Sequence, residues 1–353
     1  MLIRNLLGLG VALAAGGALL FGAPVQTGAP QPVALAAAWP AAQRGSVPSK
    51  LADGSEYTPG LFLDAKTSAG TVQSADTRQL RLVIRDGDGA LTELRRVPAQ
   101  HRTPFTALTA AGDTLVWVEG PQDKPQLWSA DRRHPASARM LTADLGAIQF
   151  FDSQNDLIVE DGRVHWAASA AGNRTEFRSV PLAGGPVTVQ RENGAWGLTG
   201  WPWAVDGHVA ARGATTLRNL TTGQSIAVPT AARTVTACSP AWCRMVSINQ
   251  DGWARIDLSH PDGSARRKVL DGNVATAITD VAVLDRFEVL AQVTAQSELS
   301  GNQQLLIYDL SNRHLVMVSP DAGNISYRAG VLWWSTGDQS SFVRNSLDLR
   351  TVG

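Results

Sequence analysis

Two cysteines offer the clearest covalent chemistry in this sequence. Cys238 and Cys243 are the only cysteines, and four residues separate them. Two thiols are too few for a tetrahedral zinc site, and the next histidine, His260, lies 17 residues beyond Cys243. In an exported protein, such a close pair most simply forms a disulfide. We therefore predict a disulfide that closes a loop around Pro240 and contributes about 2 kcal/mol of stability, with zinc-bound or free thiols as alternatives.

Tryptophans form the most unusual local composition. Trp196, Trp201 and Trp203 fall within eight residues, and Trp242 lies inside the cysteine loop. Flat aromatic rings can stack on sugars or aromatic ligands, but they also fill the core between β-sheets. We interpret Trp196, Trp201, Trp203 and Trp242 as candidate ligand contacts, and packing in the core is the alternative.

Motifs for catalysis and for metal binding are absent. The sequence has no Gly-x-Ser-x-Gly and no Ser-x-x-Lys, and its six histidines are scattered without the spacing of metal ligands. Residues 86–89, Asp-Gly-Asp-Gly, lack the additional oxygen ligands of a calcium loop and predict a hairpin turn. We identify no catalytic residue and expect no metal and no cofactor.

The charge balance argues against a nucleic-acid partner. Lys and Arg total 31, as do Asp and Glu, so the formal net charge is zero. Proteins that bind nucleic acids normally carry a basic excess or stripe that displaces counterions from phosphates. We therefore expect no nucleic-acid partner.

The N-terminal residues read as an export signal. Arg4 is followed by an uncharged, apolar stretch from Leu6 to Phe21, and small residues suited to signal-peptide cleavage occupy 34–38. The alternative is a retained membrane anchor at 6–23, since about 18 apolar residues can span a bilayer. We assign residues 1–38 to a signal peptide or anchor and 39–58 to a linker and closing strand. The protein is then secreted or extracytoplasmic, or anchored to the cytoplasmic membrane.

A repeated pattern sets the expected fold. An apolar residue, then Asp, Asn or Pro, then Leu ends a strand before a turn, with Arg218 in the apolar position of one copy. The five leucines concerned are 38, 38, 52 and 39 residues apart. With two looser equivalents, the pattern gives seven anchors, at Gly87, Ala130, Leu182, Leu220, Leu258, Leu310 and Leu349.

Short pieces of this repeat resemble known propellers. Residues 305–312, Leu-Leu-Ile-Tyr-Asp-Leu-Ser-Asn, resemble the end of a WD40 blade, and residues 179–185, Ser-Val-Pro-Leu-Ala-Gly-Gly, resemble a strand and turn of TolB-like propellers. Together with the Cys-Ser-Pro-Ala-Trp-Cys element, the chain resembles the exported TolB-like or WD40-like propellers of high-GC bacteria. That group has no general assigned activity.

Residues 59–353 are therefore predicted to form an all-β fold, a single β-propeller of about seven four-stranded blades. The chain ends just after the last anchor, so we expect a segment between residues 45 and 65 to supply the missing outer strand.

The expected function is that of a monomeric, non-catalytic binding module for a protein, peptide or glycan. The alternative is an exported hydrolase or lyase acting on polysaccharide, which two or more carboxylates and an Arg meeting in the funnel would favour.

Overall fold

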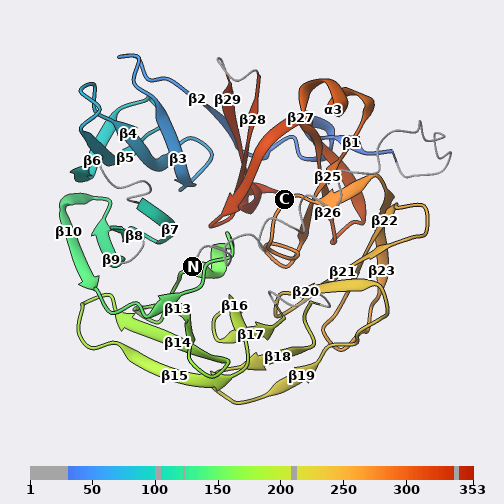
Figure 1. Cartoon of the computed structure of the whole chain (residues 1–353). Helices are drawn as coiled ribbons and strands as arrows, with labels where there is room; N and C mark the ends of the chain where they lie inside the picture. Colours follow the sequence, from blue (N-terminus) through green and yellow to red (C-terminus); the bar gives the residue numbers. More distant parts are fainter. Residues whose placement is uncertain (1–30, 100–104, 122–123, 208–212, 338–341) are drawn as a thin grey trace, which may run out of the picture.

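The computed structural model describes residues 31–99, 105–121, 124–207, 213–337 and 342–353. Its antiparallel sheets stand around a common axis as a β-propeller of seven blades (Figure 1). The all-β fold and the number of blades predicted from the repeat are confirmed. In the described part of the chain, no helix has the length and apolar composition that crossing a bilayer requires. The predicted apolar stretch at 6–23 lies outside the described residues.

Blades 1 to 3 follow one another along the chain, each running from an inner to an outer strand. Blade 1 contains β3 (Tyr57–Phe62), β4 (Ser68–Gln73), β5 (Gln79–Arg85) and β6 (Leu91–Pro98). Blade 2 contains β7 (Phe105–Ala111), β8 (Thr114–Glu119), β9 (Gln126–Asp131) and β10 (His134–Thr142). Blade 3 contains the short β11 (Ala147–Ile148) and β12 (Ile158–Glu160), then β13 (Arg163–Ala170), β14 (Arg174–Pro181) and β15 (Thr188–Asn193).

Blades 4 to 6 continue the ring. Blade 4 contains β16 (Trp196–Gly200), β17 (Trp203–Asp206), β18 (Thr216–Asn219) and β19 (Ser225–Ala227). Blade 5 contains β20 (Thr234–Cys238), β21 (Cys243–Ile248), β22 (Ala254–Ser259) and β23 (Arg267–Gly272). Blade 6 contains β24 (Val274–Thr276), β25 (Phe287–Gln292), β26 (Gln303–Asp309) and the first part of β27 (His314–Arg328), with helix α3 (Ala295–Ser300) between β25 and β26.

Blade 7 closes the ring with a strand from the other end of the chain. The second part of β27 is its inner strand, followed by β28 (Val331–Thr336) and β29 (Val343–Asp348). The outer strand is β2 (Arg44–Pro48), which pairs antiparallel with β29 over its whole length. This pairing confirms the predicted N-terminal closing strand, which begins one residue before the expected segment. It also covers an edge of β29 that would otherwise be open to pairing with another chain.

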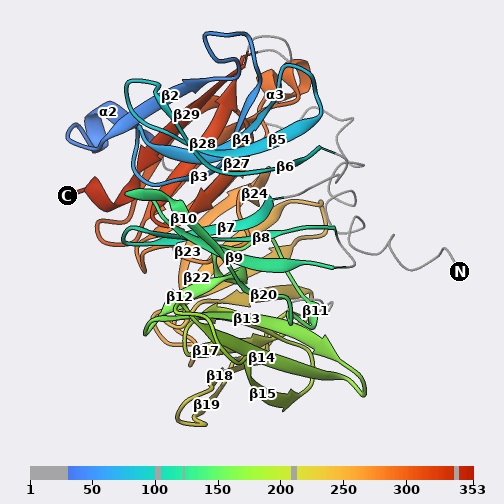
Figure 2. The same ribbon diagram turned by 90° about the vertical axis from the view of Figure 1, so that its left-hand side faces the viewer.

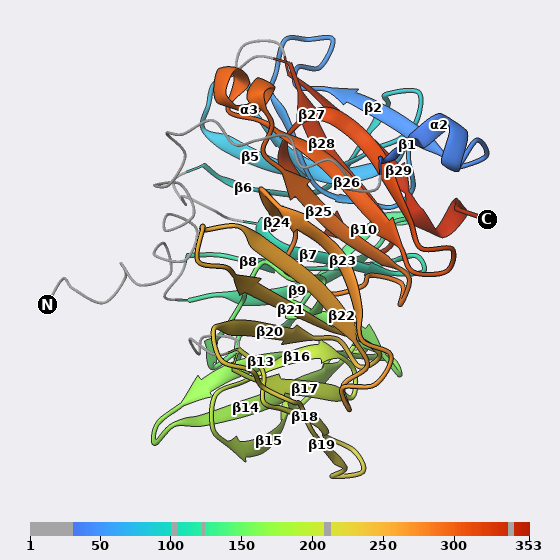
Figure 3. The ribbon, with the colours of Figure 1, turned by 90° about the vertical axis from the view of Figure 1, so that its right-hand side faces the viewer.

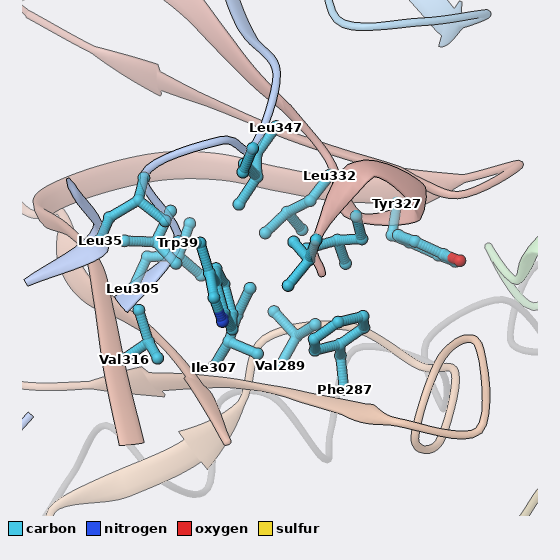
Figure 4. Packing of buried hydrophobic residues seen from close by; sticks show 14 of the residues in the cluster. Leu35, Trp39, Phe287, Val289, Leu305, Ile307, Val316, Tyr327, Leu332 and Leu347 are labelled. Carbon is cyan, nitrogen blue, oxygen red and sulfur yellow. The ribbon is translucent and has the colours of Figure 1, made fainter. Parts of the chain in front are cut away.

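The residues just before β2 pack against blades 6 and 7. Strand β1 (Val33–Ala34) pairs in parallel with β27, and helix α2 (Leu35–Ala38) follows it. Figures 2 and 3 both show α2 and β2 at the edge of the ring, on the side where the C-terminus lies. Leu35 and Trp39 are buried, and the Trp39 ring meets the Phe287 ring edge-on at 5.5 Å between centroids (Figure 4). The predicted cleavage region at 34–38 therefore contributes to this core, and the removal of residues 1–38 stays a prediction.

Candidate functional site

A cavity of the described residues lies at the centre of the ring. It has a volume of about 440 Å³ and is lined by the inner strands of blades 1, 2, 6 and 7. Three of these strands are irregular at the cavity: β3 between Pro59 and Leu61, β7 between Thr106 and Thr109, and β27 between Gly323 and Ser326. Bulges re-aim side chains and interrupt pairing, and they are frequent beside functional sites. The inner wall is therefore shaped differently here from a regular sheet.

A turn from blade 3 forms part of this wall. Strands β11 and β12 both pair with β13, and the chain between them leaves the sheet. Its tip, residues 152–156, contains the 3-10 helix η1 (Gln154–Asp156), and we call these residues the axial turn because they lie near the centre of the ring, in green in Figure 1. A capping box holds the turn: Ser153 Oγ accepts from Asn155 N, and Asp156 Oδ2 accepts from Ser153 N.

The axial turn reaches across the ring to blade 6. Both carboxylate oxygens of the buried Asp280 accept hydrogen bonds from it. Ser153 Oγ donates at 2.5 Å and Asn155 Nδ2 at 3.2 Å to Oδ1, and Gln154 N donates at 3.2 Å to Oδ2. Hydrogen bonds to an ionised group are stronger than neutral ones, so this is a substantial contact between residues more than 120 positions apart.

Arg328 of blade 7 binds the same turn. Its guanidinium donates from Nη1 to the main-chain oxygen of Ser153 at 2.9 Å and from Nη2 to Asp152 Oδ1 at 3.2 Å. The Arg328 side chain is 12% exposed, whereas that of Asp152 is 94% exposed. The guanidinium is thus fixed in the wall, and the Asp152 carboxylate stands in solvent at the tip of the turn.

A buried ion pair contacts the main chain at Asp280. Arg244 Nη1 lies 2.8 Å from Glu288 Oε1, and the two side chains are 6% and 0% exposed. Arg244 also donates to the main-chain oxygens of Thr279 and Asp280 at 3.0 and 3.1 Å. Glu288 Oε2 accepts from Ala282 N at 2.8 Å. The pair therefore holds the segment that carries Asp280 against blades 5 and 6.

Burial shifts the acid–base properties of the carboxyl groups at the axis. Loss of solvent raises the pKa of Asp156 to about 6, and the nearby Asp280 carboxylate adds to the shift. Burial also raises the pKa of Asp280, although its donors from the axial turn and the charges of Arg328 and Arg244 oppose the shift. Tyr327, which lines the cavity, has a raised pKa for the same main reason. The two buried carboxyl groups can therefore hold a proton closer to neutral pH than an exposed carboxyl can, whereas Tyr327 stays protonated.

The four predicted tryptophan contacts lie outside this cavity. Trp201 stacks on the His165 ring of blade 3 with 3.7 Å between centroids, and Trp196 donates from Nε1 to a main-chain oxygen at 2.7 Å. Trp203 is partly buried between blades 4 and 5, and Trp242 is buried and stacked on His260. Their role as ligand contacts stays a prediction.

Cys238 and Cys243 are joined by a disulfide and face each other across the β20–β21 hairpin. Within the described ranges, no group of three or more His, Cys, Asp or Glu side chains is arranged to hold a metal ion. Because Cys238 and Cys243 lie in the β20–β21 hairpin of blade 5 and do not line the cavity, the disulfide stabilises that hairpin and is not part of the cavity wall.

The axial residues were not singled out by the sequence analysis. The pattern Ser-x-x-Asp at 153–156 is a capping signature that could have indicated the turn. Nothing local in the sequence marks Asp280 or Arg328. Asp152, Asp280 and Arg328 line one cavity, so two carboxylates and an Arg do meet in the funnel, as the enzyme alternative requires.

No protein-family model matches the sequence, and no curated protein matches it either. Several solved structures do match this chain. The β-propeller domain of the Trilobed protease from Pyrococcus furiosus is 9% identical over 83% of this chain and 93% of that chain, with a TM-score of 0.53. A puromycin-hydrolyzing peptidase from Mycobacterium tuberculosis is 15% identical, also with a TM-score of 0.53, and the match covers 90% of this chain but only 53% of the peptidase. TolB from Acinetobacter baumannii is 11% identical over 82% of this chain and 65% of that chain, with a TM-score of 0.37. At these identities, the likeness to the two proteins with the higher TM-scores shows the β-propeller fold.

Proposed function

We propose that this protein is a non-catalytic binding module whose central cavity takes a segment of a protein, a peptide or a glycan. The observation that carries the proposal is the cavity itself, with its bulged inner strands and a wall of hydroxyl, main-chain and apolar groups that also includes Asp152, Asp280 and Arg328. The charged groups at its edge are already engaged, because Asp280 accepts three hydrogen bonds from the axial turn and Arg328 binds Asp152 and Ser153. In the arrangement seen here, these hydrogen bonds hold the axial turn in the cavity wall.

The proposed place of action is outside the cytoplasm. Support comes from the disulfide between Cys238 and Cys243, since disulfides persist in oxidising compartments, and from the apolar stretch at 6–23. We further propose that the protein acts as a monomer without a nucleic-acid partner, with membrane contact only through an uncleaved N-terminal segment.

The test blocks the cavity with a bulky side chain and measures whether the protein still captures a partner. Thr276 lines the cavity, so Thr276→Trp places a large ring in it, whereas Thr188→Trp adds the same ring to an exposed outer strand. Both variants and the wild type are used to recover partners from the producing cells. Recovery of a specific partner with the wild type and Thr188→Trp, but not with Thr276→Trp, is expected. Equal recovery with all three would place the binding surface elsewhere and refute the proposal.

A second candidate function is that of an exported hydrolase or lyase acting on polysaccharide. One observation favours it: the carboxyl of Asp280, whose pKa burial raises, shares the cavity with Arg328 and the exposed Asp152. A carboxyl with a raised pKa is suited to act as a general acid. Polysaccharide cleavage by the wild type that is abolished in Asp280→Asn and retained in Thr188→Trp would favour this function over the binding module.

A further inference from the structure

We infer that the axial turn occupies the binding site of an external ligand at the centre of the ring. The ligand that displaces the turn is a polypeptide segment. This inference rests on the proposed binding function of the cavity. It goes beyond that function by naming the class of the ligand and the step that limits its entry.

The turn has the geometry of an inserted segment rather than of a strand. In blade 3 the inner position is shared by β11, which pairs with β13 at Ser169 and Ala168, and β12, which pairs with β13 at 163–165. Residues 150–157 leave the sheet between these two pairings and turn back at Asp152, whose φ is +57°. A non-glycine residue with this backbone conformation is uncommon and needs support from its surroundings. Here the support comes both from the capping box within the turn and from Asp280 and Arg328 in other blades.

The wall binds the turn through groups that any polypeptide can offer. Asp280 accepts from a main-chain N–H, a side-chain hydroxyl and a side-chain amide, all within three consecutive residues. Arg328 donates to a main-chain carbonyl and to a carboxylate. The Asp280 carboxylate and the Arg328 guanidinium therefore bind one short stretch, residues 152–155. Its order is an acidic residue, a hydroxyl residue and then two amide residues.

This combination favours a peptide over a neutral glycan as the external ligand. A neutral sugar offers hydroxyl groups to Asp280, but it has no main-chain N–H and no carboxylate for Arg328. A peptide that resembles 152–155 satisfies both groups of the wall in the way that the turn already does. It can bind only after the turn has left, because the same acceptors and donors are occupied. The apparent affinity of the ligand is then lowered by the small fraction of molecules in which the turn is open.

The test weakens the turn and leaves the wall intact. Ser153→Ala combined with Asn155→Ala removes two of the three donors to Asp280. The probe is a fluorescent, end-capped peptide with the sequence of residues 149–157, Gln-Phe-Phe-Asp-Ser-Gln-Asn-Asp-Leu. Its scrambled version is the control. We expect the double variant to bind the probe at least about tenfold more tightly than the wild type, because the open fraction rises. Adding Asp280→Asn to the double variant is expected to abolish this gain.

A measurement on the wild type covers the case in which the double variant does not fold. Saturating probe is expected to speed hydrogen exchange at the amides of residues 153–156 and to slow exchange along 323–328 of β27. Equal probe affinity in wild type and double variant, equal affinity for the scrambled peptide, or unchanged exchange in the turn would each overturn the inference. Binding of an oligosaccharide that Thr276→Trp blocks, without binding of the probe, would reject the peptide class and leave the proposed function standing. Binding of no ligand that Thr276→Trp blocks would reject the proposed function itself.

Discussion

The buried ion pair between Arg244 and Glu288 gives a quantitative test of how blade 6 supports the site. Replacing Arg244 by Met leaves the Glu288 carboxylate, which is 0% exposed, with the N–H of Ala282 as its remaining donor. Leaving one charge of a buried pair without its partner costs about 3–5 kcal/mol. The reverse variant, Glu288→Leu, leaves a guanidinium that is 6% exposed without its counter-charge, and we expect a similar loss.

The double variant, Arg244→Met with Glu288→Leu, removes both charges. It still leaves the main-chain oxygens of Thr279 and Asp280 without the guanidinium donor and the N–H of Ala282 without its acceptor. Each unsatisfied buried group costs about 1–3 kcal/mol, less than an uncompensated charge. Relative to Arg244→Met, the double variant exchanges an uncompensated charge for one unsatisfied N–H, so we expect it to be the more stable of these two. We also expect its loss of stability to be smaller than the sum of the two single losses.

The assay is urea unfolding at equilibrium, with the free energy of unfolding measured for the wild type, both single variants and the double variant. The exposed pair Arg96 and Glu93 provides the control, since surface ion pairs are worth about 0–1 kcal/mol. Removing either member of the control pair should change stability little. A double variant whose loss equals the sum of the two single losses would refute the argument, because it would show that Arg244 and Glu288 are not coupled.

Four further predictions concern groups elsewhere in the ring. Burial lowers the pKa of His165 to about 4, so the unfolded chain takes up a proton that the folded protein resists. His165→Phe should therefore gain stability relative to the wild type as pH falls from about 6.5 to about 4 in thermal unfolding. The pKa of Asp156 is raised to about 6, so the folded protein takes up this proton first. Asp156→Asn should lose stability relative to the wild type as pH falls from about 6 to about 4, and a pH-independent difference would contradict the assignment. Reduction of the Cys238–Cys243 disulfide should lower the free energy of unfolding by about 2 kcal/mol, and a variant with Ser at both positions should not respond to reductant. Trp39→Ala should cost about 3–5 kcal/mol in urea unfolding, because the ring is 5% exposed; a loss below about 1 kcal/mol would show that the residues before β2 are dispensable for the fold.

The blades could be predicted from the sequence because their signal is local. Each anchor falls in, or just after, the third strand of a blade, and in several blades a polar side chain ends this strand by accepting from the backbone of the next residues. Asn219 Oδ1 accepts from Thr221 N and Thr222 N, and Asp309 Oδ1 accepts from Ser311 N. These contacts span two or three residues, so residue type and spacing reveal them without knowledge of the ring.

The axial site could not be predicted in the same way, because its contacts are long-range. Ser153 and Asp280 are 127 positions apart, and Ser153 and Arg328 are 175 positions apart. The tryptophans predicted as ligand contacts lie elsewhere in the ring. Trp201 and Trp242 are stacked on histidines outside the cavity, and their role as ligand contacts stays a prediction. Whether a tryptophan meets a ligand depends on which blade face it covers, and a single sequence does not show this.

A weaker signal for the site was nevertheless present in the spacing of the repeat. Two steps between anchors are 52 residues long, from Ala130 to Leu182 and from Leu258 to Leu310, whereas several others are close to 38. The first long step contains the axial turn, and the second contains the irregular segment after β24 that carries Asp280, together with α3. The inner ends of all blades face one axis, so extra residues added to the inner strands of two distant blades can meet there. In this ring they do meet, through the hydrogen bonds between the axial turn and Asp280. The two places where the repeat is lengthened therefore supply the axial turn and Asp280, whereas Arg328 and the rest of the cavity wall come from blades of ordinary length.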